Sequence, residues 1–267
     1  MKRTFLLTMA VLLLLPGLQA QIIGTGTLAD PYRGINAGNF TISGTKYFNG
    51  NLGVSSGTLT LMPGTRLICR NKYASILISG TGQVSAQGTA LRPILVTADT
   101  DGDGNVGESS DFWGNFFMTS TGTSNFSHCT VENGQRTRFS FTGGAFHVRS
   151  GTLNFTDGTI RKSIAVNGGA MYLEAGATVT VKNTFIINNG AVDNGGAIYM
   201  AAGSSPVISS TVFYNNSSSS ATLKGGAIAS IASSPVIINS SFVNNTSPAA
   251  DGQAIYLEDS PDAKIVN

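Results

Sequence analysis

The stretch Gly195-Gly196-Ala197-Ile198 decides the fold, because its pattern of two glycines, an alanine and an apolar residue recurs along the chain. The other copies begin at Gly143, Gly168 and Gly225, and a degraded copy, Gly-Gln-Ala-Ile, begins at Gly252. The spacings between successive copies are 25, 27, 30 and 27 residues. Self-similarity at such a period is typical of repeat architectures, in which each repeat is one supersecondary unit.

A second marker keeps the same phase as the glycines. It is a phenylalanine followed three residues later by an asparagine, at Phe185–Asn188, Phe213–Asn216 and Phe242–Asn245. Each copy lies 17 or 18 residues after the first glycine of its repeat. Because two independent markers hold one phase, the repeat is a property of the fold and not of the glycine content.

Within a repeat, apolar and polar residues alternate with a period of two, which indicates strands. In residues 195–200, Ile198 and Met200 share one face of a strand, while Ala197 and Tyr199 share the other. No segment after residue 21 carries a convincing apolar stripe with the helical period. A short all-strand repeat cannot bury its own apolar face, but stacked copies can. We therefore predict an all-β fold, a right-handed single-stranded parallel β-helix of about eight or nine coils.

Stacking of coils predicts columns of equivalent side chains. Two inward columns are expected on the strand after the glycines: Phe146, Met171, Ile198, Ile228, Ile255, and Val148, Leu173, Met200, Ser230, Leu257. The second marker predicts a third column, Phe185, Phe213 and Phe242, and an amide ladder formed by Asn188, Asn216 and Asn245. The paired glycines fit a bend that needs either a positive φ or close approach to the adjacent coil.

Gly-Gly-Ala-Ile followed by Phe-x-x-Asn resembles the repeat of the polymorphic outer membrane proteins. These are surface-exposed bacterial β-helix proteins, and many of them are adhesins of autotransporter type. The matching motifs lie within residues 168–258, about a third of the chain. The resemblance implies a β-helix with a binding role at a cell surface. It implies little about the ligand, because one scaffold can host unrelated activities.

The chain begins with a segment typical of a secretory signal peptide. Residues 1–20 read MKRTFLLTMAVLLLLPGLQA, with a basic start, a short apolar run and a small residue at the end. We therefore expect a secreted or cell-surface protein whose mature chain starts at Gln21. The apolar run is too short for a comfortable membrane span, and no other long apolar stretch follows, so we predict no transmembrane helix.

Three segments are predicted after this reading. Residues 1–20 form the signal peptide, residues 21–110 form irregular N-terminal capping coils, and residues 111–267 form the regular repeats. Because Asn267 falls partway through a coil, we expect the repeat region to be truncated at its C-terminus. Association with an outer membrane is compatible with the resemblance, but the mode of anchorage stays open.

Composition narrows the partners. Charged residues make up only 11% of the chain, and the net charge of +2 falls to zero without Lys2 and Arg3 of the leader, so we expect no nucleic-acid partner. We expect a monomer that binds a carbohydrate or a protein surface. Cys69 and Cys129 are the only cysteines. They form either a disulfide, as an oxidising compartment allows, or two buried free thiols, which we favour.

An acidic run predicts a calcium site. Residues 99–105 read Asp-Thr-Asp-Gly-Asp-Gly-Asn, which matches the first half of an EF-hand loop. The glutamate expected at position twelve is replaced by Ser110, and Asp111 follows one place late. The candidate ligands of Ca²⁺, on a loop that projects before Trp113, are Asp99, Asp101, Asp103, Asn105 and Asp111. The alternative is a solvated acidic turn, because Asp-Gly and Gly-Asn are ordinary turn dipeptides.

An outward column predicts a binding strip. His147, Tyr172, Tyr199 and Tyr256 share one phase, interrupted by Ala229, and stacked coils would align their rings on the surface. Tyrosine offers apolar area with a polar tip, so such a strip suits a sugar ring or a partner protein. The alternative is that like residues stack because stacking stabilises the sheet.

The sequence favours binding over catalysis. Many β-helix enzymes are polysaccharide lyases or glycosidases, and a glycosidase needs carboxylates that converge on one face. The acids of the repeats are sparse, and the basic residues between Arg136 and Lys162 are not coupled to a carboxylate pair at a recognisable spacing. We predict no catalytic residues and an adhesin-like function, with a carbohydrate-active enzyme as the alternative.

Overall fold

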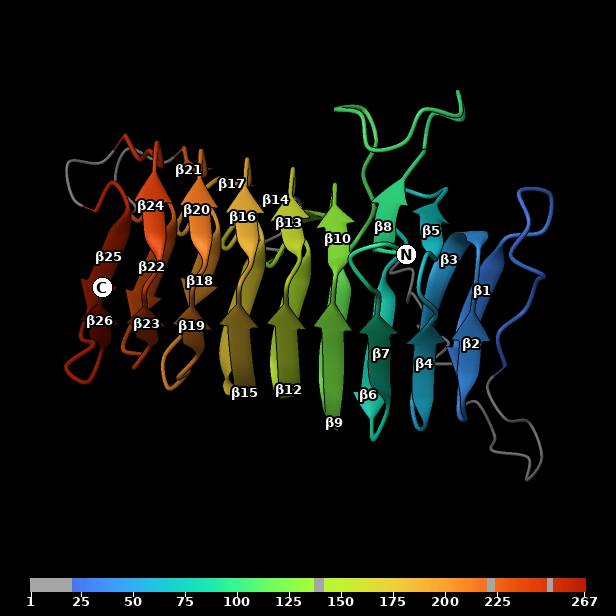
Figure 1. Cartoon of the computed structure of the whole chain (residues 1–267), viewed down its shortest axis with the longest axis horizontal. Helices are drawn as coiled ribbons and strands as arrows, with labels where there is room; N and C mark the ends of the chain where they lie inside the picture. The colour runs from blue at the N-terminus through green and yellow to red at the C-terminus, as the bar shows by residue number, and fades with distance from the viewer. Residues whose placement is uncertain (1–20, 137–141, 220–223, 249–251) are drawn as a thin grey trace, which may run out of the picture.

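The computed structural model describes residues 21–136, 142–219, 224–248 and 252–267, so the expected signal peptide lies outside the described residues. Every regular element in these ranges is a β-strand. The strands lie side by side along the long axis of the molecule and pair in parallel with the strands of the next coil (Figure 1). They form about eight coils of a solenoid, so the predicted parallel β-helix is confirmed.

Each coil has three main faces, and each face is a parallel sheet. The first face contains β1 (Tyr32–Asn36), the end of β3 (Thr45–Val54), β6 (Ile76–Gly80), the starts of β9 (Phe116–Ser127), β12 (Phe146–Thr156) and β15 (Met171–Lys182), then β18 (Ile198–Met200), β22 (Ile228–Ile231) and β25 (Ile255–Glu258). The second face contains β2 (Phe40–Ile42), β4 (Thr58–Leu61), β7 (Gln83–Gln87), the ends of β9, β12 and β15, then β19 (Val207–Ser209), β23 (Val236–Ile238) and β26 (Lys264–Val266).

The third face contains the start of β3, β5 (Arg66–Cys69), β8 (Ile94–Ala98), β10 (Cys129–Glu132), β13 (Thr159–Arg161), β16 (Phe185–Ile187), β20 (Val212–Tyr214) and β24 (Ser241–Val243). A short fourth face contains β11 (Gln135–Arg136), β14 (Ile164–Ala165), β17 (Gly190–Ala191) and β21 (Ser217–Ser218). The parallel ladder also runs through the coils before residue 110, where β1 to β8 pair in the same way.

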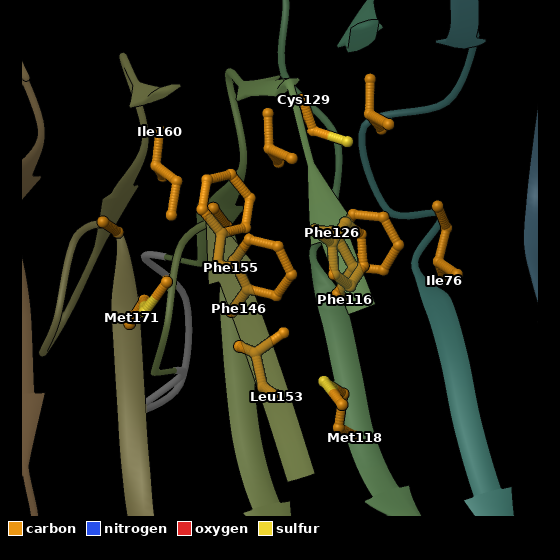
Figure 2. Close-up of a cluster of buried hydrophobic side chains, with 14 of the residues drawn as sticks. Ile76, Phe116, Met118, Phe126, Cys129, Phe146, Leu153, Phe155, Ile160 and Met171 are labelled. Atoms are coloured by element: carbon orange, nitrogen blue, oxygen red, sulfur yellow. The ribbon is translucent and has the colours of Figure 1, made fainter. Parts of the chain in front are cut away.

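The two inward columns of the first face have the predicted register. Phe146 aligns with Met171, Ile198, Ile228 and Ile255, and the next inward column aligns Val148 with Leu173 and Met200. The phenyl rings pack in the interior (Figure 2): the ring centroids of Phe116 and Phe146 are 5.0 Å apart. This continuous apolar interior is the main source of stability, because burial of apolar area dominates folding.

The predicted third column is wrong by one residue at its first member. Ile186, not Phe185, aligns with Phe213, and Phe213 aligns with Phe242. The Phe185 side chain therefore points outward, with 53% of its surface exposed. The coil that begins at Gly225 is one residue shorter than its neighbours, and a shift of one residue moves a strand side chain to the opposite face.

The amide ladder is displaced in the same way. Asn189, not Asn188, aligns with Asn216 and Asn245, and all three are buried. The Asn189 Nδ2 donates to Asn216 Oδ1 at 3.0 Å, and the Asn216 Nδ2 donates to Asn245 Oδ1 at 2.9 Å. Asn188 instead lies outside the corner and accepts a hydrogen bond from Asn215 Nδ2 at 2.7 Å.

The two glycines of each motif have different tasks. The first has a positive φ, for example 63° at Gly195. The second allows close approach, since a Cβ at Gly196 would overlap the carbonyl oxygen of Gly226 in the next coil and the backbone of Ser217. Both physical reasons that the sequence suggested for the glycine pair therefore hold, one at each position.

The cysteines are free. Cys69 on β5 and Cys129 on β10 are both buried. Desolvation raises the pKa of each thiol to about 12. Neither thiol is therefore activated as a nucleophile, and both behave as small apolar core residues.

Candidate functional site

Aromatic rings follow one another along the outward side of the first face. The register pairs Phe117 with His147, His147 with Tyr172, and Tyr172 with Tyr199. In each adjacent pair the ring centroids are 5.0 Å apart; the first two pairs meet edge to face, and the tyrosines stack with planes 15° apart. We call these four residues the aromatic strip. The structure thus brings together three of the four ring residues that the sequence predicted for this column.

Phe117 extends the strip by one coil and was missed by the sequence prediction. Its neighbour Phe116 aligns with Phe146 in the interior, so Phe117 must face outward. The signal was present in the sequence, because Trp113-Gly114-Asn115-Phe116 lies 30 residues before Gly143 and resembles the glycine motif in phase.

Tyr256 does not continue the strip. Ala229 occupies the intervening coil and carries no ring, so Tyr256 is separated from Tyr199. The Lys224 ammonium lies 4.4 Å from the Tyr256 ring centroid and donates to its hydroxyl at 3.0 Å. The Tyr256 hydroxyl in turn donates to Glu258 Oε2 at 2.9 Å. Tyr256 therefore belongs to a separate polar cluster.

His147 links the aromatic strip to charged residues. Its Nε2 lies 2.7 Å from Glu174 Oε1, and its Nδ1 lies 3.1 Å from the Thr142 hydroxyl. The other carboxylate oxygen of Glu174 accepts from Arg149 Nε at 3.2 Å. These contacts fix the ring and place a carboxylate and a guanidinium beside the strip.

Partial burial shifts the titration of the strip. Desolvation lowers the pKa of His147, although its hydrogen bond to Glu174 and the charge of that carboxylate act in the opposite direction. Desolvation also raises the pKa of Tyr172 and of Tyr199. The strip is therefore uncharged near neutral pH, which suits contact with the apolar face of a ligand.

The acidic run lies on a loop between β8 and β9 that projects from the solenoid (Figure 1). Asp99, Asp101 and Asp103 each place an oxygen within 4.8 Å of the others. The Asp99 carboxylate is buried and pairs with Arg70, whereas Asp101 and Asp103 are exposed. A hydrogen bond from the Ser110 hydroxyl is the first cause that lowers the pKa of Asp101. Converging carboxylate oxygens are the ligands that Ca²⁺ prefers.

The other two predicted calcium ligands have different contacts. Asn105 donates its backbone N and its Nδ2 to the carboxylate of Asp103, at 2.8 and 2.9 Å. Asp111 is buried, and its Oδ1 accepts the backbone N of Thr100 at 2.6 Å. Asp111 therefore closes the neck of the loop, and the convergent carboxylates are three of the five predicted ligands.

Charged pairs join adjacent coils on the third face and beside it. Arg161 Nε lies 2.7 Å from Glu132 Oε2, and the buried Glu132 also accepts from Thr97 Oγ1 at 2.8 Å. These pairs couple basic residues that are a full coil away in sequence. Asp157, which the sequence placed in a strand region, lies in a turn with a φ of 53°.

The fold and its outward columns define a right-handed parallel β-helix protein. The family model described as "Right handed beta helix region" matches residues 114–267, more than half of the chain, so the chain belongs to that family. The fold is shared by adhesins and by carbohydrate-active enzymes. Comparison with curated proteins and with solved structures gave no match. Within the described ranges, no helix has the length and apolarity needed to cross a membrane.

Proposed function

We propose that the protein is an exported, adhesin-like binding protein that uses the aromatic strip to hold a sugar ring or a partner protein at a cell surface. The resemblance of its repeats to those of polymorphic outer membrane proteins supports the surface role, and the signal-like residues 1–20 support export.

The observation that carries the proposal is the unbroken file of rings from Phe117 to Tyr199. Three successive centroid distances of 5.0 Å make one continuous platform across four coils. Aromatic rings provide contact area with few rotatable bonds, so little conformational entropy is lost on binding. Glu174 and Arg149 supply hydrogen-bonding groups at its edge.

The alternative is a carbohydrate-active enzyme. Such an enzyme needs carboxylates that converge in a cleft on either side of the scissile bond. In the described part of the chain, the three carboxylates that converge are Asp99, Asp101 and Asp103, on the projecting loop, and Asp99 is already paired with Arg70. This placement favours the binding function over catalysis.

The test uses the mature chain from Gln21 on a glycan array and on cultured cells. The variant Tyr172→Ala/Tyr199→Ala removes the stacked pair, and Thr180→Ala on the same strand, outward on the second face, is the matched control. We expect at least a tenfold loss of binding in the first variant and none in the control, with similar melting temperatures.

Two outcomes would overturn the proposal. One is a double tyrosine variant that binds as the wild type does. The other is release of reducing ends when the wild-type chain is incubated with polysaccharides, which would favour the enzyme. Export is tested separately by sequencing the N-terminus of the secreted chain, where we expect Gln21 as the first residue.

A further inference from the structure

A groove runs beside the projecting loop, over the short fourth face. Its volume is about 510 Å³, within the range of small-molecule sites. Residues 109–112 of the loop form one wall, and the floor includes Gln135, Ile164, Gly190 and Ser217 from β11, β14, β17 and β21. The aromatic strip lies on the first face, and none of its residues lines this groove.

The wall of the groove is held in place by contacts between distant parts of the chain. Asn133 Nδ2 donates to the carbonyl oxygens of Glu108 and Asp111, at 2.6 and 2.8 Å. Lys162 Nζ donates to the carbonyl oxygen of Gly107 at 2.9 Å. The groove is thus formed before a ligand arrives, which reduces the entropic cost of binding.

The lining offers unused hydrogen-bonding groups. The hydrogen bond from Asn215 Nδ2 to Asn188 Oδ1 leaves the Asn188 amide nitrogen and the Asn215 amide oxygen without a partner in the described residues. Asn133 is 4% exposed, and its Oδ1 has no partner either. A buried amide oxygen without a donor is rare in native proteins and indicates a missing partner, such as a ligand hydroxyl or water.

The remaining lining is neutral and partly apolar. Phe112 and Ile164 supply apolar surface, and 39% of the Ile164 side chain is exposed. Lys162 and Asp111 are the two charged residues of the lining, and both already bond to the backbone of the loop. Amides and hydroxyls beside small apolar surfaces match a ligand with many hydroxyl groups and apolar C–H faces.

We propose that this groove is a second binding site, and that its ligand is a short oligosaccharide recognised through its hydroxyl groups. The proposal goes beyond the aromatic strip and does not depend on it. It assigns the exposed amides of Asn188 and Asn215 the role of contacting the sugar hydroxyls.

Calorimetric titration of the mature chain tests the proposal with a panel of xylo-, manno-, cello- and chito-hexaose and an oligogalacturonate. The groove variant is Asn188→Gly/Asn215→Gly, because both residues have a φ of 55° and glycine keeps that conformation. The matched control is Asn183→Gly, an exposed asparagine with a φ of 49° at another corner. We expect the wild type and control to bind at least one oligosaccharide, and the groove variant to lose at least tenfold in affinity.

The proposal is overturned if the wild type binds no member of the panel, or if the groove variant binds as tightly as the control. Comparison with Tyr172→Ala/Tyr199→Ala separates the two sites. Loss only in the groove variant supports this proposal whatever the fate of the aromatic strip, and loss only in the tyrosine variant supports the strip and overturns the groove.

Discussion

Two asparagine ladders run side by side along the corner between the third and fourth faces, and only one of them is buried. The buried ladder contains Asn189, Asn216 and Asn245, which are 2%, 0% and 8% exposed. The outer one contains Asn188, Asn215 and Asn244, each next to a buried partner in sequence, with φ values of 55°, 55° and 53°. Residue type is the same in both, so burial and backbone conformation alone separate their roles.

The buried ladder satisfies its own hydrogen bonds. Asn216 Oδ1 accepts from the backbone N and Nδ2 of Asn189, both at 3.0 Å, and Asn216 Nδ2 donates to Asn245 Oδ1 and to the carbonyl oxygen of Ile186. The outer ladder leaves amide groups unpaired at the groove. The comparison indicates that a buried column stabilises the solenoid, whereas the exposed column beside it is available for a ligand.

The largest expected effect comes from adding one methyl group on each side of this boundary. Gly196→Ala places a Cβ against the backbone of Gly226 and Ser217, which cannot move without breaking the stack. We expect a loss of about 4 kcal/mol in the free energy of unfolding, or failure to fold. Gly190→Ala is the control, since its Cβ would lie 3.6 Å from the Ile164 side chain at the groove floor, and we expect a change within about 0.5 kcal/mol. Urea unfolding measures both, and equal losses would contradict the comparison.

The second effect separates the ladders directly. Asn216→Ala leaves buried groups of Asn189, Asn245 and Ile186 without partners, so we expect a loss of about 3 kcal/mol. Asn215→Gly removes an exposed amide and keeps the left-handed conformation, so we expect stability to stay within about 0.5 kcal/mol. Urea unfolding of the two variants is the measurement. A similar loss in both would mean that the outer ladder is structural.

The first face was predictable from the sequence because the glycine pair precedes each of its strands at a constant distance. Phe146, Met171 and Ile198 all follow their glycines by the same count, so the register could be read directly. The third face was not, because the coil after Gly225 is one residue shorter, and one residue decides whether Phe185 or Ile186 faces inward.

The two sites differ in the same way. The aromatic strip was largely predictable, because Tyr172 and Tyr199 sit one residue from an inward column. The groove was not, because its wall depends on contacts such as Lys162 with Gly107, which are 55 residues apart and have no repeat to reveal them. Irregular insertions between coils therefore hold the part of the surface that periodicity cannot predict.

A smaller effect is expected from calcium, because the projecting loop repeats the contrast between buried and exposed groups. Asp99 is buried and paired with Arg70, while Asp101 and Asp103 are exposed and close to it. If Ca²⁺ joins the three carboxylates, a concentration of ten times Kd stabilises the chain by about 1.4 kcal/mol, and a chelator removes that gain. A thermal melt with calcium and with chelator measures the shift, and Asp101→Asn should reduce it. Identical melts would leave the loop as a solvated acidic turn.

The smallest effect concerns His147, which is neither fully buried nor free: its side chain is 15% exposed and hydrogen-bonded to Glu174. Desolvation lowers the pKa of this imidazole in the folded chain below its ordinary value of 6.5. As the pH falls through 6.5, the unfolded chain therefore takes up a proton before the folded chain does, and stability decreases until the folded pKa is reached. The free energy of unfolding should fall more steeply between pH 7.5 and 5.5 for the wild type than for His147→Gln, which lacks the titrating ring. Equal slopes would show that Glu174 compensates fully for burial, and that the strip behaves like the exposed side of the comparison rather than the buried one.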